Sequence, residues 1–154
     1  MKLNIREATQ SDFKQLLDLN NEWFDEGISP GTLKESEYSF RKEFKNSTFF
    51  IAEVNSEIIG FLKCRVKIAK EDSKIHHISE GEKYVDLDSV FIKKNFRNKG
   101  IGTKLLKYCI ANVRRVGYKK VIASADSKNL QKLVKFYERQ GFKTLFTRML
   151  LEFK

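Results

Sequence analysis

The chain of 154 residues has one proline, two cysteines and no long apolar run. The single proline leaves little room for extended linkers, and the length suits one domain over residues 1–154. No stretch approaches the ~20 apolar residues of a membrane span, and the first residues lack the apolar core of a signal peptide. Cys64 and Cys109 lie in apolar patterns and are too few for a disulfide framework. We therefore expect a cytoplasmic protein with no membrane partner.

Acidic residues are also absent between Ser89 and Ala125. This window holds ten of the 30 Lys and Arg residues, and the other 20 balance the 20 Asp and Glu residues. The net charge of +10 is therefore confined to the window. Its basic residues are Lys93, Lys94, Arg97, Lys99, Lys104, Lys107, Arg114, Arg115, Lys119 and Lys120. Such a concentration attracts a polyanion, although a solvated helix face would give the same composition.

The segment 90–106 is the most informative part of this window. Its apolar run 90–92 predicts a strand, and a short basic turn then leads to Gly100 and Gly102 at the start of a periodic helix. Backbone N–H groups at such a helix start, next to Arg97, are suited to phosphate oxygens. Neither the P-loop fingerprint nor the dinucleotide fingerprint is present. The sequence thus predicts a site for some other phosphorylated cofactor.

Apolar periodicity predicts that strands and helices interleave along the whole chain. The expected strands cover residues 3–6, 48–54, 58–68, 84–92 and 121–124, with one or two closing strands between Lys143 and Phe153. The expected helices cover about 13–24, 34–45, 101–113 and 129–140, the first opened by a capping box from Thr9 to Asp12. This order favours a mixed α/β or α+β fold with helices on both faces of one sheet.

Three segments occur in the order and at the spacing of a known family. They are Arg97-Asn98-Lys99-Gly100-Ile101-Gly102 after its strand, Tyr137-Glu138-Arg139-Gln140-Gly141-Phe142 after Asn129, and the opening Ile5-Arg6-Glu7-Ala8-Thr9 with Asp12. On these segments the chain resembles the GNAT superfamily of acetyl-CoA-dependent N-acetyltransferases, from end to end. The resemblance implies a mixed, mostly antiparallel sheet of six to seven strands with helices on both faces.

The resemblance also implies that acetyl-CoA is the acyl donor, and we expect no metal. The pyrophosphate would lie on backbone N–H groups of the basic turn, where glycines admit a close approach. The pantetheine arm would pair with strand 90–92, whose side chains are equally suited to the core. Asn129 would contact the cofactor arm or only cap the last helix. The expected cofactor-binding residues are Val90, Phe91, Ile92, Arg97, Asn98, Lys99, Gly100, Ile101, Gly102, Thr103 and Asn129.

The implied reaction is direct attack of a primary amine on the thioester through a tetrahedral intermediate. Tyr137 occupies the family's position for the acid that protonates the leaving thiolate, although it could simply pack on the core. A base must also take the amine proton, because a free alkylamine has a pKa near 10. Asp86 and Asp88 lie on one face of the strand before the turn, and we favour Asp86 over Asp88. Salt bridges to lysine would explain both carboxylates equally well, with a water chain as the base.

The amine acceptor is not identified by the sequence. An aromatic and acidic cluster near the end of the first helix would suit a cationic amine, or would be a plain helix end. Its members are Glu22, Trp23, Phe24, Asp25 and Glu26. We expect His76 and His77 to be exposed in a loop, without the spacing of a metal site. Members of this family are often homodimers, but nothing here fixes the oligomeric state.

Two other functions are consistent with the composition. A non-catalytic basic module could bind nucleic acid, and a module of the same fold could sense acyl-CoA. We do not expect nucleic acid as the partner, because the basic residues cluster on a cofactor-like turn and no nucleic-acid motif occurs. The leading hypothesis is therefore an N-acetyltransferase.

Overall fold

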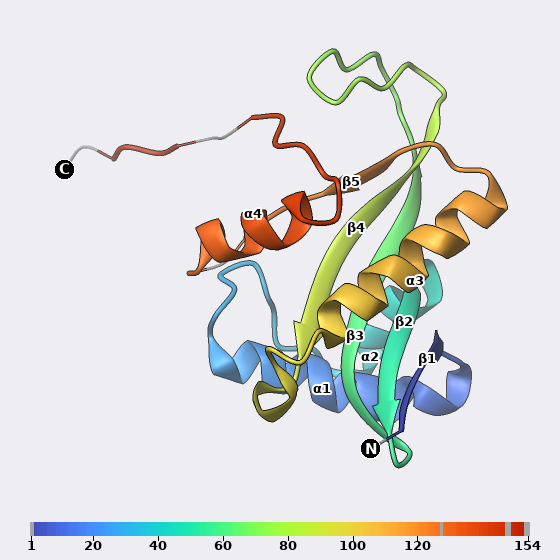
Figure 1. Ribbon diagram of the computed structural model, residues 1–154, viewed down its shortest axis with the longest axis vertical. Helices are drawn as coiled ribbons and strands as arrows, with labels where there is room; N and C mark the ends of the chain where they lie inside the picture. The colour runs from blue at the N-terminus through green and yellow to red at the C-terminus, as the bar shows by residue number, and fades with distance from the viewer. Residues whose placement is uncertain (1, 127, 147–148, 153–154) are drawn as a thin grey trace.

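The centre of the molecule is one sheet of five strands in the order β1-β2-β3-β4-β5 (Figure 1). This computed structural model describes residues 2–126, 128–146 and 149–152. The strands are β1 (Leu3–Glu7), β2 (Thr48–Val54), β3 (Glu57–Ile68), β4 (Lys83–Ile92) and β5 (Val121–Ala123). Neighbours from β1 to β4 run antiparallel, whereas β5 is parallel to β4.

Within the described ranges, four α-helices cover the two faces of this sheet. They are α1 (Phe13–Glu26), α2 (Glu37–Asn46), α3 (Ile101–Val116) and α4 (Leu130–Glu138), with single 3-10 turns at η1 (Gln10–Asp12) and η2 (Lys94–Phe96). Helices α1 and α2 pack on one face, and α3 and α4 on the other (Figure 1). The expectation of a mixed α/β sheet with helices on both faces is confirmed. No helix in this part of the chain is both long and apolar enough to cross a membrane.

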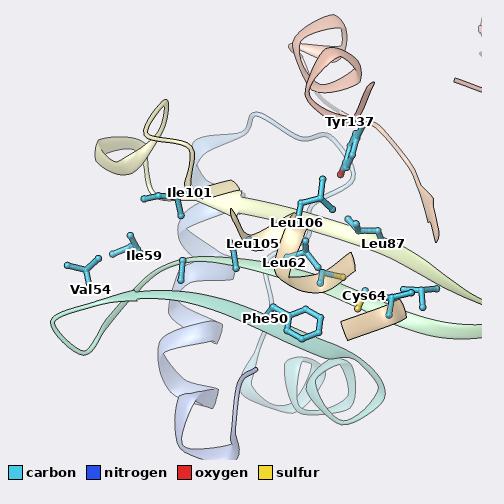
Figure 2. Close-up of a cluster of buried hydrophobic side chains, with 14 residues drawn as sticks. Phe50, Val54, Ile59, Leu62, Cys64, Leu87, Ile101, Leu105, Leu106 and Tyr137 are labelled. Atoms are coloured by element: carbon cyan, nitrogen blue, oxygen red, sulfur yellow. The ribbon is translucent and has the colours of Figure 1, made fainter. Parts of the chain in front are cut away.

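Alternation along the central strands divides the core into two halves. In β2, Phe50 and Ala52 belong to the half beneath α3, whereas Phe49 and Ile51 belong to the half beneath α1 and α2. Successive residues of a strand point to opposite faces, so each strand supplies both halves. Figure 2 shows the half beneath α3, which also receives Tyr137 from α4.

The sheet has fewer strands than the six to seven that the resemblance implied. No strand forms at residues 143–146 or 149–152, where closing strands were expected, and the rest of that range lies outside the described residues. Alternating apolar residues form a strand only where a neighbouring strand supplies hydrogen bonds. This segment instead extends away from the sheet (Figure 1), and Met149, Leu150 and Leu151 are exposed.

The capping box expected from Thr9 to Asp12 is present and ties β1 to the start of α1. The Arg6 guanidinium donates to the buried Asp12 carboxylate at 2.7 and 2.9 Å, and the Thr9 N–H donates at 2.7 Å. The bonds from Arg6, aided by those from Thr9, outweigh burial and lower the pKa of Asp12 to about 2.

Candidate active site

Strand β4 leaves part of one edge open where it approaches α3. Strand β5 pairs with it only from Val85 to Leu87, and in the described chain no strand lies beside the remainder of that edge. Figure 1 shows β4 and β5 diverging beyond this point. On its other edge β4 carries a bulge at Asp88, which has no partner opposite it in β3. Bulges are common beside active sites, and an open edge allows an extended ligand to add as a strand.

The predicted pantetheine residues lie on this open part of β4. Phe91 is buried against α1, whereas Val90 and Ile92 pack on the half of the core beneath α3. Their side chains are therefore core residues. Any contact with an extended ligand on this edge would use their backbone, as the sequence analysis expected.

The turn between β4 and α3 presents a run of unpaired backbone N–H groups. Asn98 and Gly100 adopt left-handed conformations, with φ of 61° and 74°. Helix α3 begins at Ile101 without a side-chain cap, and the N–H groups of residues 98–103 find no acceptor among the described residues. The helix dipole adds partial positive charge at the same place. Such a nest of amides at a helix start binds anions.

The space around the two glycines of this turn is open. A Cβ at Gly100 would meet no atom within 4 Å, so the residue is required for its left-handed conformation and not for lack of space. A Cβ at Gly102 would meet the Phe136 ring at 3.7 Å, which is an ordinary contact. The residues present therefore fit a bulky anion such as a diphosphate.

Most of the positive charge around the turn is unpaired. Of the ten basic residues between Ser89 and Ala125, only Lys93, Arg97 and Lys120 form ion pairs in the described part of the chain. The other seven are Lys94, Lys99, Lys104, Lys107, Arg114, Arg115 and Lys119. Lys94, Lys99 and Lys104 lie in the turn or the first turn of α3, where they can neutralise phosphate.

Arg97, which the sequence analysis assigned to the cofactor, has a protein partner for its side chain. Its Nη2 donates to both carboxylate oxygens of Glu26, at 2.8 and 2.6 Å. Its Nε donates to the Ile92 carbonyl at 2.8 Å, and its guanidinium carbon lies 5.3 Å from the centroid of the Phe91 ring. The Arg97 N–H also donates to the Lys94 carbonyl at 3.3 Å, so the unpaired N–H groups of the turn begin at Asn98.

Tyr137, the predicted acid, is buried in the face of α4 that meets the core. Its ring lies 5.2 Å from that of Phe136 and 5.3 Å from that of Phe142, centroid to centroid. Burial raises the pKa of Tyr137 to about 12. In Figure 2 its hydroxyl points from α4 toward the sheet, on the side where Leu106 lies. Tyr137 also lines a cleft of about 780 Å³ between α3, β5 and α4.

Asp86 and Asp88, the predicted bases, are both ion-paired on the opposite face of β4. Lys67 binds Asp86, while Arg65 and Lys63 bind Asp88 at 2.5 and 2.9 Å. Burial alone would raise the pKa of Asp88, but its hydrogen bonds from Lys63 and Arg65 outweigh burial and lower that pKa. The structure thus brings the two carboxylates to one face, as expected, but away from the face that holds Tyr137.

Asn129 occupies the N-cap position of α4, without a side-chain capping hydrogen bond. Its carbonyl accepts the N–H of Lys132 at 3.0 Å and that of Leu133 at 3.2 Å. Asn129 therefore stands at the start of the helix that carries Tyr137, but the side-chain cap expected from the sequence does not form.

The aromatic and acidic cluster at the end of α1 is partly exposed: Phe24, Glu22 and Asp25 reach the surface, with 39%, 43% and 62% of their area exposed. Trp23 stacks on Phe91 with centroids 5.8 Å apart, so it belongs to the interior, and Glu26 is occupied by Arg97. In the loop 69–82, His76 is hydrogen-bonded to Ser73 at 2.7 Å. Among the described residues, no group of three or more His, Cys, Asp or Glu side chains could hold a metal ion.

Two features of this site were not foreseen from the sequence. One is the pairing of Glu26 with Arg97 across 71 positions, and the other is the bulge at Asp88. The only signal in the sequence for the Glu26–Arg97 pair was the opposite charge of two segments, the acidic end of α1 and the basic turn before α3. Nothing in the local sequence indicates the second.

The family model of the GNAT acetyltransferases matches residues 13–142. The chain therefore belongs to the acetyltransferase (GNAT) family, and the resemblance drawn from its three segments is confirmed.

Individual relatives agree with this assignment. An uncharacterised N-acetyltransferase of Methanocaldococcus jannaschii is 27% identical over 144 residues, which are 90% of this chain. The chain matches 59% of that protein's length. Among solved structures, the chain is similar to the aminoglycoside N-acetyltransferase AAC(6')-Iy bound to a bisubstrate analogue of CoA. The TM-score is 0.73 at 16% identity, and the match covers 100% of this chain and 99% of that one. A ribosomal-protein-alanine N-acetyltransferase of Brucella melitensis biovar Abortus 2308 has a TM-score of 0.70 at 13% identity, over 99% and 100%. At these identities the structures establish the fold.

Proposed function

We propose that this chain transfers the acetyl group of acetyl-CoA to a primary amine. The observation that carries the proposal is the turn between β4 and α3, where residues 98–103 offer unpaired N–H groups beside unpaired lysines. An uncapped helix start is costly unless water or a ligand satisfies it, and a diphosphate is the ligand with the matching charge. Membership of an acetyltransferase family, with a neighbour of the same fold bound to a CoA analogue, supports CoA as the carrier of that diphosphate.

Each part of the donor would meet a different part of the site. The backbone N–H groups of residues 98–103 would hold the pyrophosphate, with Lys99 and Lys104 as charge partners. The open edge of β4 at residues 90–92 would pair with the pantetheine arm, and its N–H groups would polarise the thioester carbonyl. Asn129 would contact the arm from the start of α4. Acetyl-CoA supplies the activated acetyl group.

Tyr137 is the residue that we propose as the acid for the departing thiolate. With a pKa of about 12, its hydroxyl stays protonated at neutral pH and is available as a donor to the departing thiolate. Burial makes it a weaker acid than a free phenol, and because a thiol has a pKa of about 8.5, the thiolate is a weaker base than the Tyr137 phenolate. The ring is fixed by Phe136 and Phe142, so the hydroxyl is positioned with little loss of entropy.

The amine would approach from the other face of β4, where Asp86 and Asp88 lie. We still favour Asp86 as the proton acceptor, directly or through water. Asp88 is held by Lys63 and Arg65 together, whereas only Lys67 binds Asp86. Asp86 thus has fewer charged partners among the described residues with which an incoming amine would compete.

The proposal names only a broad class of acetyl acceptor, the primary amines. One relative is described as an aminoglycoside acetyltransferase and another as acting on a ribosomal-protein alanine, so amines of very different size are used within this fold. We propose a primary amine and leave its identity to a screen. A cytoplasmic location and a homodimer also stay predictions.

Two measurements test the proposal. Calorimetric titration of CoA should give saturable binding, and Gly100→Trp should abolish it while the protein stays folded by circular dichroism. Release of free CoA from acetyl-CoA should then be screened against polyamines, aminoglycosides and lysine peptides, with mass spectrometry of the acetylated product. Absence of CoA binding by folded protein would contradict the proposal.

The seven unpaired basic residues favour one alternative, a module that binds nucleic acid. Titration with single-stranded RNA and duplex DNA at two salt concentrations distinguishes the two functions. Tight, salt-dependent nucleic-acid binding without CoA binding would favour the alternative. If CoA binds but no amine is acetylated, an acyl-CoA sensor becomes the better description.

A further inference from the structure

The contact between Arg97 and Glu26 joins two parts of the chain that no local interaction would hold together. Glu26 ends α1, and Arg97 begins the turn that leads to α3. The pair is hydrogen-bonded through both oxygens of the carboxylate, and the two side chains are only 30% and 20% exposed. Both hydrogen bonds come from one nitrogen, Nη2, and as charge-assisted bonds they are stronger than hydrogen bonds between neutral groups.

Other contacts make the position of Arg97 specific. Its Nε donates to the carbonyl of Ile92, the last residue of β4, and its guanidinium lies over the Phe91 ring. The side chain therefore spans from the end of β4 to the end of α1. Lysine could not reproduce this, because it lacks the planar fork with several donors.

The chain beyond Glu26 runs toward the other side of the site. Gly27 ends α1 in a left-handed conformation, and the Ile28 carbonyl then accepts the N–H of Lys128 at 3.0 Å. Lys128 lies just before Asn129 and α4. The end of α1 thus contacts both the turn before α3 and the segment before α4.

We propose that Glu26 and Arg97 form a positioning pair, which holds the turn after Arg97 in the shape that presents the N–H groups of residues 98–103 to the CoA diphosphate. This inference rests on the proposed function. Neither side chain binds the phosphates: the charge of Arg97 is neutralised by Glu26, and the unpaired lysines neutralise the ligand.

If Arg97 instead bound the phosphates directly, removal of Glu26 would change the CoA affinity in the opposite direction. If Arg97 leaves Glu26 to bind phosphate directly, Glu26 competes with the ligand, and its removal should tighten CoA binding. If the pair holds the turn, removal of Glu26 should weaken binding. Glu26→Gln is nearly isosteric, so it shows whether CoA binding becomes weaker or tighter with little change in packing.

The experiment is calorimetric titration of CoA into the wild-type chain, Glu26→Gln and Asp18→Asn. Asp18 lies on the same helix in an exposed pair with Lys14, so its variant matches the loss of one negative charge. We expect Glu26→Gln to weaken CoA binding by about tenfold, the loss of a charged hydrogen-bonded pair, and Asp18→Asn to stay within about twofold. Unchanged or tighter binding by Glu26→Gln would overturn the inference. Failure of the wild-type chain to bind CoA would instead count against the proposed function.

A second variant tests the positioning role independently, in case Glu26→Gln folds poorly. Arg97→Lys retains the charge but loses the fork, so a positioning role predicts a loss of CoA affinity similar to that of Glu26→Gln. Near-normal affinity in Arg97→Lys would favour direct charge contact and refute the pair. In turnover, both variants should raise KM for acetyl-CoA and leave kcat within about twofold, a split that general loss of folded protein would not give.

Discussion

On the face of the sheet covered by α1 and α2, charged side chains are paired. Lys63, Arg65 and Lys67 contact the carboxylates of Glu43, Asp86 and Asp88 across β3, β4 and α2. Around α3, by contrast, seven basic side chains have no acidic partner in the described chain. Unpaired like charges do not help a chain to fold, because they repel one another.

The difference separates two uses of charge within one domain. Where charges are paired and part-buried, they belong to the fold and their removal should appear in stability. Where they are unpaired and exposed, they should matter to a ligand and leave stability almost unchanged. Substitutions on the two faces therefore test whether paired and unpaired charges have these separate roles.

The largest effect is expected from the aromatic core beneath α1. Phe61 is 1% exposed, and its ring contacts those of Trp23, Phe49 and Phe91 at centroid distances of 5.8 to 6.2 Å. Phe61→Ala should lower the free energy of unfolding by about 3–5 kcal/mol, measured by urea denaturation. Tyr38→Ala, at a side chain that is 90% exposed, is the control and should change it by less than about 0.5 kcal/mol. A small loss in Phe61→Ala would mean that this face does not carry the stability.

The next effect concerns catalysis on the opposite face. Tyr137→Phe should lower kcat about 100-fold or more and leave KM for acetyl-CoA nearly unchanged, because only the proton donor is removed. Tyr108→Phe on α3 makes the same chemical change away from the proposed reaction and should keep kcat. With the pKa of Tyr137 near 12, the pH–rate profile below about pH 10 should reflect another group. Normal turnover by Tyr137→Phe would remove the residue from the role of acid.

A pH-dependent effect should arise from the paired charges at the start of α1. Hydrogen bonds from Arg6 lower the pKa of Asp12 from 3.8 to about 2. A depressed carboxyl pKa stabilises the folded state above the unfolded pKa, and that contribution is lost as the pH falls through the folded pKa. The wild-type chain should therefore lose about 2 kcal/mol of stability between pH 4 and pH 2 through this group. Asp12→Asn should be less stable at pH 7 and should show a shallower loss below pH 4. Equal acid dependence in both proteins would contradict this account.

These features differ in how far the sequence could predict them. Periodicity located the strands and helices of the described chain to within a few residues, because each element must bury one face. The closing strands expected after Lys143 were wrong for the described residues, since apolar residues there have no strand beside them to pair with. The Arg97 turn was predicted from its glycines and basic residues, which are adjacent in sequence. Its partner Glu26 was not, because that contact depends on how α1 packs against β4.

The smallest effect is the one that most directly compares the two faces. Lys104 is exposed in the first turn of α3 and forms no ion pair with any described residue, whereas Lys63 is 17% exposed and contacts Glu43 and Asp88. Lys104→Met should weaken CoA binding about fivefold and leave stability within about 0.5 kcal/mol. The affinity of the wild-type chain should also fall more steeply with added salt than that of the variant, because one cation no longer faces the phosphates.

Lys63→Met should behave in the reverse manner. It leaves two part-buried carboxylates with fewer partners, so stability should fall by about 1–2 kcal/mol while CoA affinity stays within about twofold. The pair of variants removes one lysine charge each, so long-range electrostatics cannot explain opposite outcomes. If both variants lose CoA affinity equally, the division between charges that hold the fold and charges that bind the ligand is wrong.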